Sequence, residues 1–401
     1  MISVEEYLAT VLALADGAVL AVESVVLPAA LGRVLAAGQS ALLAVPPFDN
    51  SAMDGFAVRA ADVASVPAVL RVVGESAAAS GPIPVVEPGC AVRVMTGGRL
   101  PSGADAVVPV ELTDQPIGYA PLPEWVEVRE AVGSGRNVRR AADDLAAGDP
   151  VLRAGELITP GTIASAASVG LGVLPVNRRP RVAVVATGAE LVPAGRPVAE
   201  GEIPDSNSVM LAALAARAGA EVVAAECSGD DPGELAALLE RLPEADLIIT
   251  SGGVSAGAYE PLRLLEAELE FCSVAMQPGK PQGCGRVNGV PLLAFPGNPV
   301  SSFVSFHVFG RPLLETFAGL LPRDRTRTAT AAVGWNTPPG RRQYLPVQLD
   351  ETAGGTLVRP SHRRGSGSHL VASLHLADAL AVVGAEVEAV AAGDPITILE
   401  V

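Results

Sequence analysis

The sequence predicts a multidomain protein that combines one α/β domain with smaller β domains. Three observations indicate this fold class. The chain has 401 residues, which is too long for one ordinary hydrophobic core. Residues 178–318 alternate continuous apolar runs with helical segments, as expected for a mainly parallel sheet. Residues 45–141 and 319–401 hold short β-type runs separated by glycine and proline, as expected for two small β domains, the second barrel-like.

The N-terminal segment is expected to be helical over residues 1–44. Apolar side chains recur there at helical spacing, and Ser3 with Glu6 matches a capping box. Residues 142–177 return to alanine-rich sequence punctuated by glycine. We predict that 1–44 and 142–177 form one discontinuous N-terminal domain into which the β domain 45–141 is inserted.

The elements of the α/β domain follow from its hydrophobic pattern. Apolar runs of four to six residues predict buried strands, and longer amphipathic segments predict helices. An Asp-Pro pair opens one helix in the way expected of a first turn. Strands are predicted at 182–186, 221–226, 247–250 and 291–295, and helices at 208–218, 231–242, 260–268 and from 299 onward.

Composition excludes several classes of function. The formal net charge of −16 argues against a general binder of nucleic acids or anionic membranes.

We expect no signal peptide, because Glu5 and Glu6 stand where a basic leader would be, and no membrane span. The four cysteines lack the spacing of a zinc site or disulfide framework and predict thiols in a reducing cytoplasm. Dinucleotide and P-loop glycine patterns are also missing from the sequence.

Glycine-rich loops follow three of the predicted strands. They are Thr187–Glu190, Ser251–Gly257 and Pro296–Ser301. Ligands of open α/β sheets bind at the carboxyl ends of strands, and backbone N–H groups in such loops favour anions. A single glycine pair is usually only a turn, so the recurrence at three strand ends carries the prediction of an anion-binding site.

Carboxylates accompany these loops and suggest a magnesium site. They are Glu190, Asp205, Asp230 and Glu260. Carboxylate oxygens beside bound phosphates are ligands that Mg²⁺ prefers. Helix N-capping is the competing interpretation of these carboxylates. The residue types alone support a magnesium site and helix N-capping equally.

Lys280 is the only lysine of the chain and stands in the segment Pro-Gly-Lys-Pro. Arginine replaces lysine everywhere else, which suggests that position 280 requires a compact point charge, as for a tetrahedral anion. An ordinary surface lysine is the alternative, and the rigid frame favours a functional role.

The segment Pro46–Val58 contains two aspartates, Asp49 and Asp54, in a turn-rich stretch before a predicted strand. Asn, Ser, Asp and Gly favour tight turns, so we expect both carboxylates to be held on a fixed turn. A solvated hairpin loop is the alternative. The segment reads PPFDNSAMDGFAV and closely resembles PPFDNSAMDGYAV, which is characteristic of the molybdopterin molybdenumtransferases (the MoeA family, with plant and gephyrin E domains), and differs only at Phe56.

The resemblance extends along essentially the whole chain in the family's order. Its further motifs are VRVMTGGRLPSGADAVVPVE (92–111), ATGAEL (186–191), PDSN (204–207), GDDP (229–232), SGGVSAG (251–257), PGKP (278–281) and FPGNPVSS (295–302).

This resemblance implies a central MogA-like α/β domain that binds molybdopterin, a homodimer, and a working cleft between the α/β domain of one subunit and the β domain of the other. It implies Mg²⁺-dependent cleavage of adenylated molybdopterin, with release of AMP and insertion of molybdenum from molybdate. Asp54 and Thr96 would be the functional pair on the β domain. Glu190, Asp230 and Glu260 would form the acidic set near metal and adenylate. The molybdate pocket would comprise Ser255, Lys280, Pro281, Ser301 and Ser368, and the remaining cofactor-binding residues would be Gly188, Asp205, Asn207, Gly252, Gly253, Gly297 and Asn298.

Three positions depart from the family pattern. Glu260 stands where many relatives have Asp, and Gln277 where many have a second Lys. Pro346 stands where relatives often have an Arg, and Arg341 or Arg342 is the candidate to replace it. Two alternatives to the insertion activity are a molybdopterin adenylyltransferase, which ATP turnover with pyrophosphate release would reveal, and a non-catalytic dimeric scaffold. The β domain with Asp54 and Thr96 opposes the first, and the nearly complete acidic set opposes the second.

Overall fold

The structure is a computed structural model that describes residues 1–77, 81–254, 261–265, 267–362 and 367–401. The chain divides into two compact units. The first comprises residues 1–23, 32–34 and 176–401, and the second residues 24–31 and 35–175. The predicted division into four domains is finer than this and stays a prediction. Within the described ranges no helix is long and apolar enough to cross a membrane.

A six-stranded sheet forms the centre of the first unit. Four strands run parallel in the order β15, β12, β16, β20. Strand β19 continues the sheet antiparallel to β20, and the edge strand β17 is in turn antiparallel to β19. The predicted α/β fold with a mainly parallel sheet is therefore confirmed. The strands are β12 Arg181–Thr187, β15 Glu221–Ser228, β16 Leu247–Ser251, β17 Glu268–Ser273, β19 Pro281–Val287 and β20 Val290–Phe295.

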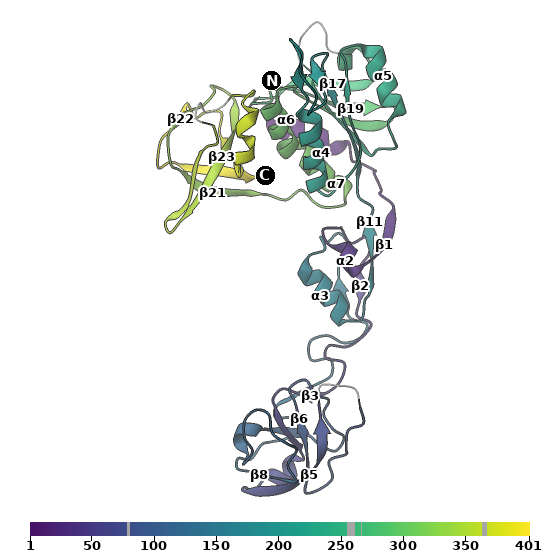
Figure 1. The fold of residues 1–401 in the computed structure, drawn as a ribbon, viewed down its shortest axis with the longest axis vertical. Coiled ribbons are helices and arrows are strands. Elements are labelled where there is room, and N and C mark those ends of the chain that lie inside the picture. The colour runs from purple at the N-terminus through teal and green to yellow at the C-terminus, as the bar shows by residue number, and fades with distance from the viewer. Residues whose placement is uncertain (78–80, 255–260, 266, 363–366) are drawn as a thin grey trace. The chain divides into compact units, whose positions relative to one another are not determined.

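Helices cover both faces of this sheet (Figure 1). Successive strand side chains point to opposite faces, so Val182 and Val184 pack in one core and Ala183 and Val185 in the other. Burial on both faces explains the continuous apolar run in the sequence. One face carries α1 Val4–Ala13, α4 Asn207–Arg217, α6 Pro299–Ser305, the π-helical turn η4 Phe306–Gly310 and α7 Arg311–Phe317; the other carries α5 Pro232–Arg241 and the 3₁₀ turn η3 Pro261–Leu264.

Two predicted helices are wrong in part. The capping box of Ser3 and Glu6 is confirmed, but the first helix ends at Ala13. Beyond it the chain forms β1 Val22–Val26, α2 Leu27–Ala30 and β2 Gln39–Ser40, because β1, with valine at three of its five positions, pairs with the distant strand β11 Val173–Asn177. The predicted helix 260–268 includes residues 260 and 266, which lie outside the described residues. Its described part contains η3 and the start of β17, an edge strand whose pairing with β19 overrides its helical composition.

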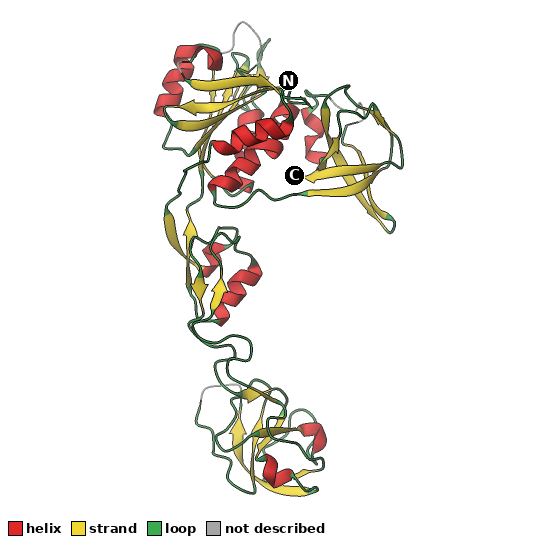
Figure 2. Ribbon diagram, turned by 180° about the vertical axis from the view of Figure 1, so that it is seen from behind, coloured by secondary structure: helices red, strands yellow, loops and turns green. Residues whose placement is uncertain are grey.

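The C-terminal region of the first unit is a closed barrel of five strands (Figure 2). The ring runs β23, β24, β21, β27, β25 and back to β23. Strand β18, Met276–Gln277, pairs in parallel with the start of β23, so the barrel is joined to the segment that carries Lys280. The strands are β21 Thr326–Ala331, β23 Arg342–Thr352, β24 Gly355–Pro360, β25 Ala379–Val383 and β27 Pro395–Glu400, with the short pair β22 Trp335–Asn336 and β26 Ala389–Val390 and the 3₁₀ helix η5 Val371–Leu376.

The second unit contains a five-stranded sheet in the order β7, β4, β6, β5, β8. Its core is formed by Phe56, Val58, Leu70, Val108 and Val126. The strands are β4 Gly55–Val58, β5 Ala68–Ser76, β6 Cys90–Val94, β7 Ala106–Pro109 and β8 Trp125–Val128, joined by the 3₁₀ turns η1 Ala60–Val63 and η2 Val110–Leu112. The remaining short elements of the chain are β3 Asn50–Ser51, β9 Val138–Arg139, β10 Pro150–Leu152, α3 Pro160–Ser168, β11 Val173–Asn177, β13 Leu191–Val192 and β14 Ile203–Pro204.

Candidate active site

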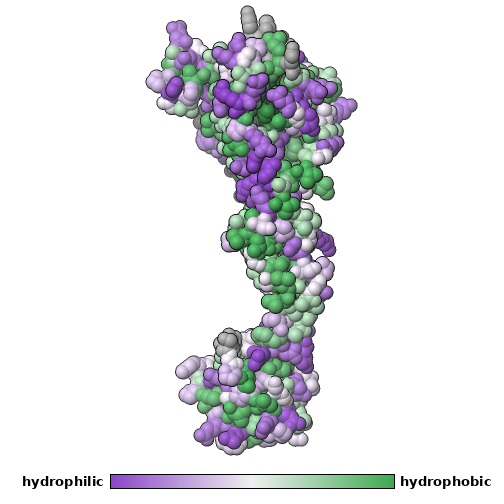
Figure 3. All heavy atoms as spheres, turned by 90° about the vertical axis from the view of Figure 1, so that its right-hand side faces the viewer, coloured by the Kyte–Doolittle hydropathy of each residue, from purple (hydrophilic) through white to green (hydrophobic). Residues whose placement is uncertain are grey.

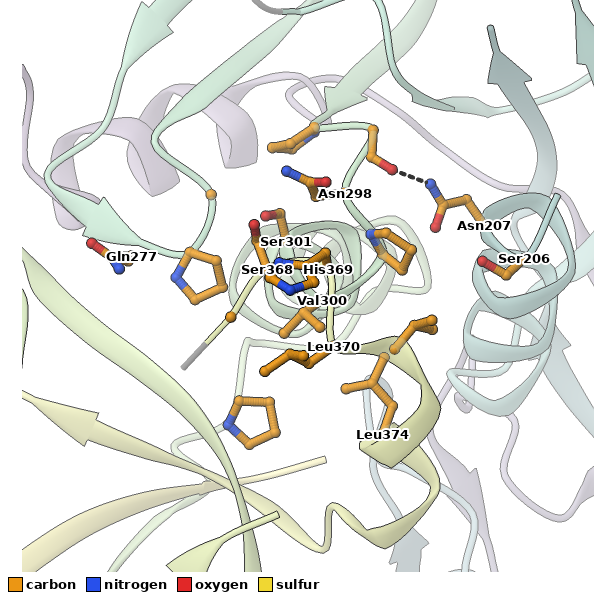
Figure 4. A pocket seen from close by; sticks show the side chains of 18 of the residues that line it. Ser206, Asn207, Gln277, Asn298, Val300, Ser301, Ser368, His369, Leu370 and Leu374 are labelled. Carbon is orange, nitrogen blue, oxygen red and sulfur yellow. Dashed lines mark hydrogen bonds between the residues drawn. The ribbon is translucent and has the colours of Figure 1, made fainter. Parts of the chain in front are cut away.

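A cavity of about 990 Å³ opens in the first unit at the carboxyl ends of the parallel strands. One side is formed by the loops after β12 and β20 and by the start of α4, and the other by the barrel strand β23 and the segment before η5 (Figure 4). The parallel sheet thus places its predicted ligand edge against the barrel. The described lining includes residues 187, 190–191, 203–207, 276–281, 296–301, 341, 344, 346, 361–362, 367–371 and 373–374.

Asn207 joins three loops at this edge. Its Nδ2 donates to Ser251 Oγ at 2.8 Å and to the Gly297 carbonyl at 2.6 Å. The Ser251 hydroxyl in turn lies 3.1 Å from Ser302 Oγ on α6. Asn207 Oδ1 is buried and has no hydrogen-bond partner within the described part of the chain. Because a buried unpaired acceptor is costly, this oxygen is a candidate to receive a ligand N–H.

Asp205 is an anchoring residue in this structure. Its Oδ1 accepts the backbone N–H groups of Asn207 and Ser208 at 2.9 and 3.0 Å, and its Oδ2 accepts the Ser208 hydroxyl. The Cys227 thiol donates to the same carboxylate at 2.8 Å. Burial, with the hydrogen bond to Asp205, raises the pKa of Cys227 to about 12, so the thiol stays protonated. The carboxylate therefore fixes the start of α4 at the wall of the cavity.

Helix α6 begins at Pro299 beside the cavity and continues through η4 and α7. The N–H of Val300 donates to the Ser368 carbonyl at 3.2 Å, which brings Ser368 to the side chain of Ser301 (Figure 4). These two predicted molybdate residues are separated by many positions in sequence and adjacent in space. The positive end of the helix dipole lies behind them, which favours an anion.

Two basic side chains other than histidine stand among the described lining residues, those of Lys280 and Arg341. Lys280 is exposed. Arg342 does not line the cavity; its guanidinium donates to Glu5 at 2.6 Å. Of the two candidates to replace the missing arginine at Pro346, the structure therefore brings only Arg341 to the cavity.

The glycines at the strand ends connect neighbouring strands. Gly252 has φ +97°, and a Cβ there would lie 2.5 Å from the Thr187 carbonyl oxygen, so a side chain would not fit. The N–H of Gly252 donates to Phe295 O, and that of Gly188 to Ser228 O. These two amides are therefore occupied by protein carbonyls and not free for an anion. Gly188, Gly252 and Gly253 do not line the cavity, whereas Gly297 and Asn298 do.

Of the three predicted metal ligands, the structure describes Glu190 and Asp230. Glu190 lines the cavity, and Asp230 is exposed just after the end of β15. Glu260 and Ser255 lie outside the described residues. Within the described ranges no three or more His, Cys, Asp or Glu side chains gather as a metal site. Asp231 caps α5 by accepting the Glu234 N–H at 2.9 Å, as predicted.

Asp54 and Thr96 form a hydrogen-bonded pair in the second unit. Asp54 Oδ1 accepts the Thr96 backbone N–H at 2.6 Å and its hydroxyl at 2.8 Å. These bonds hold the pKa of Asp54 below its ordinary value, so the carboxylate is ionised and oriented. The other aspartate of this segment, Asp49, is fixed by the Ala141 N–H and an ion pair with Arg140.

Comparisons with known proteins cover nearly the whole chain. Three family models match in succession: the MoeA N-terminal region (domain I and II) at residues 2–170, a probable molybdopterin binding domain at 183–316 and the MoeA C-terminal region (domain IV) at 328–401. Molybdopterin molybdenumtransferase 2 of Mycobacterium tuberculosis is 44% identical over 346 residues, which cover 82% of this chain and 84% of that protein. This chain belongs to the molybdopterin molybdenumtransferase (MoeA) family.

Other members support the same assignment. The molybdopterin molybdenumtransferase of Staphylococcus aureus is 32% identical over 88% of this chain and 85% of its own length. Among solved structures, the MoeA protein of Pyrococcus horikoshii superposes with a TM-score of 0.81 at 29% identity and covers 100% of this chain and 99% of its own. The family resemblance predicted from the motifs is thus confirmed.

Several residues of this MoeA-family cavity were missed by reasoning from sequence. Tyr344, Ser361, His362 and Ser373 come from the barrel and the segments before and within η5, far along the chain from the strand-end loops. The hydroxyl of Ser361 is buried without a hydrogen-bond partner in the described structure. No local motif identifies these residues, because their proximity to the cavity depends on the pairing of β18 with β23.

Proposed function

We propose that this protein inserts molybdenum from molybdate into adenylated molybdopterin and releases AMP, in the cytoplasm. The observation that carries the proposal is the cavity of about 990 Å³, where Lys280, Arg341 and the start of α6 converge in a chain of net charge −16. A local concentration of positive charge in an acidic protein favours an anionic small molecule. The relatives named molybdopterin molybdenumtransferase support this choice of anion.

Molybdate is a tetrahedral dianion, and the lining offers donors suited to it. Lys280 supplies a point charge and Arg341 a planar set of N–H donors. The hydroxyls of Ser301 and Ser368 stand together at the start of α6. We assign the molybdate position to this group, with Pro281 and Gln277 beside it on the Lys280 segment.

The rest of the cavity is assigned to the pterin and its phosphates. Asn207 Oδ1 is a buried acceptor that a pterin N–H would satisfy. Gly297 and Asn298 form the adjacent wall, and Leu370 and Leu374 offer apolar contact to a flat ring (Figure 4). A ligand of mixed polar and apolar character fits such a lining.

We propose that the acidic residues at the neighbouring strand ends hold Mg²⁺. Glu190 and Asp230 follow β12 and β15, which lie side by side, and the Ser228 hydroxyl at the end of β15 is buried without a partner in the described ranges. Mg²⁺ is commonly bound by one or two carboxylates together with waters and substrate phosphates. When bound, it would stabilise the charge that develops on the cleaved phosphates. Glu190 and Asp230 would orient it, and Glu260 stays a predicted third ligand.

A homodimer is part of the proposal. Large apolar side chains are exposed on the second unit on or beside β1, α2, β2 and β11, and Figure 3 shows hydrophobic surface on this part of the chain. Contiguous exposed apolar surface of this kind marks protein contacts. We propose a second copy of the chain as the partner, and Asp54 with Thr96 as catalytic groups in the resulting dimer. The exposed residues are Val26, Leu31, Leu42, Leu43 and Val173.

The test is AMP release from adenylated molybdopterin in the presence of Mg²⁺, with and without molybdate. Release stimulated by molybdate is the expected outcome. If folded dimeric protein releases no AMP under either condition, the insertion activity is refuted and a non-catalytic member is indicated. Turnover of ATP with pyrophosphate release would instead indicate the adenylyltransferase activity.

A further inference from the structure

The only lysine of the chain stands in a turn whose backbone is held by one buried side chain, that of Gln282. Gln282 is fully buried and does not line the cavity. Its Nε2 donates to the Gly279 carbonyl at 2.7 Å and to Ser305 Oγ at 2.7 Å. Both N–H bonds of the amide are thus used. The orientation of the amide follows from the chemistry, because the Gly279 carbonyl can only accept.

These contacts fix the direction in which Lys280 leaves the backbone. The Gly279 carbonyl belongs to the planar peptide group that precedes the Lys280 Cα. The carbonyl of Lys280 itself belongs to the following peptide group and accepts the Val274 N–H at 2.8 Å. With both flanking peptide planes held, the Cα–Cβ bond of Lys280 has a defined direction. The side chain beyond it is exposed and lines the cavity.

The same amide connects the Lys280 turn to the helix at the cavity. Ser305 is fully buried at the last residue of α6, the helix whose first residues carry Ser301. Gly279 has φ +101°, and a Cβ there would lie 3.1 Å from Gln282 Nε2 and 3.3 Å from Ser305 Oγ, so the turn is packed directly on this pair. Gln282 therefore sets the position of the lysine relative to the positive end of α6.

Packing alone does not account for a glutamine here. Its Oε1 is buried and has no hydrogen-bond partner among the residues that the structure describes. An unpaired buried acceptor disfavours the folded state, and an apolar side chain of equal size would avoid that cost. The two N–H donors of the amide therefore explain why glutamine stands at this position.

We propose that Gln282, assisted by Ser305, is a positioning residue that holds Lys280 against an oxyanion in the cavity. The inference rests on the proposed function, since it takes molybdate as the anion. Gln282 acts through Lys280 and touches no substrate. Its effect on anion binding must therefore disappear when the lysine side chain is removed.

The experiment is a double-mutant cycle on the full-length protein, with molybdate binding measured by isothermal titration calorimetry. Gln282→Met keeps the size of the side chain and removes both donors. In the wild-type background we expect it to weaken molybdate binding about tenfold, the scale of lost hydrogen bonds. In the Lys280→Ala background we expect a change of less than about twofold. Gln348→Met, a matched substitution on the barrel outside the cavity lining, should leave binding unchanged in both backgrounds.

Each outcome separates the positioning role from the function itself. Equal weakening by Gln282→Met in both backgrounds would show a general structural effect and overturn the positioning role. If Lys280→Ala weakens binding but Gln282→Met does not, the positioning role fails and the proposed function stands. If the wild-type protein binds no molybdate, the proposed function is refuted, and the positioning role that rests on it is refuted as well. Should Gln282→Met not fold, Ser305→Ala in both backgrounds gives the same test, with a weakening of about threefold expected from the loss of one hydrogen bond.

Discussion

Thr96 holds the carboxylate of Asp54 through two hydrogen bonds to one oxygen, at 2.6 Å from its backbone N–H and 2.8 Å from its hydroxyl. Asp54 lies just before β4, and Thr96 follows β6, the neighbouring strand that pairs with it. The arrangement leaves Asp54 Oδ2 without a hydrogen-bond partner in the described structure while the side chain stays exposed. An ionised, oriented carboxylate with one free oxygen is suited to catalysis.

Thr96→Ala should raise the pKa of Asp54 towards its ordinary value of 3.8, because one of the two bonds that stabilise the carboxylate is lost. Because the pKa of Asp54 is lowered in the folded protein, the carboxylate is ionised at pH values above this lowered pKa. Its charge is lost as the pH falls through the pKa of the folded state. The carboxyl resonance of Asp54 followed by NMR titration measures the shift. Thr10→Ala, on the surface of α1, is the control and should leave the titration of Asp54 unchanged.

Arg341→Ala and Arg342→Ala should have different effects. Arg341 lines the cavity, so its removal should lower molybdate-stimulated AMP release, by about tenfold for a charged hydrogen-bond donor. Arg342 pairs with Glu5, so its removal should leave turnover intact and reduce the free energy of unfolding by about 0.5 kcal/mol or less, as for other partly exposed ion pairs. Steady-state kinetics measure the turnover of both variants, and urea unfolding measures their stability. Equal losses of turnover in both variants would contradict the placement of Arg341 alone at the anion.

Gln277→Lys should strengthen molybdate binding. Gln277 lines the cavity on the segment that carries Lys280, and a second ammonium there adds an attractive charge. We expect a lower KM for molybdate with little change in unfolding, and a smaller gain at high salt because the charge is screened. An unchanged KM would place the anion away from this segment.

Asn207→Ala should destabilise the first unit by about 1–3 kcal/mol, because the Ser251 hydroxyl and the Gly297 carbonyl lose a buried donor. Urea unfolding measures the cost. Ligand binding should weaken as well, since the variant also removes the unpaired Oδ1. For the unfolding measurement, Ser206→Ala is a suitable control, because its side chain makes no capping bond to α4.

Leu42→Asp combined with Leu43→Asp should dissociate the proposed dimer. The two side chains are 63% and 52% exposed within the chain, so the fold of the second unit should tolerate the change, whereas a charged residue in an apolar contact is costly. Sedimentation velocity should show a monomer. Ile117→Asp, on the exposed loop before β8, should remain dimeric; a dimeric double variant would exclude this surface as the contact.

Much of the fold was predictable because its signals are local. The run Val182 to Ala186 is apolar at every position and matches a strand buried on both faces. Ser3 with Glu6, and Asp231, cap helices through bonds within one turn. The first forty-four residues failed as a helix because the strand β1 depends on its pairing with β11, which lies far along the chain.

The sequence by itself determined the family, the α/β sheet and the loops at its strand ends, because these depend on short motifs and hydrophobic periodicity. The tertiary structure alone decided which side chains share the cavity. Arg341 reaches it while Arg342 binds Glu5, and Gln282 supports Lys280 through a hydrogen bond to the Gly279 carbonyl. Such choices depend on strand register and on the closing of the barrel, which bring together residues that share no local pattern.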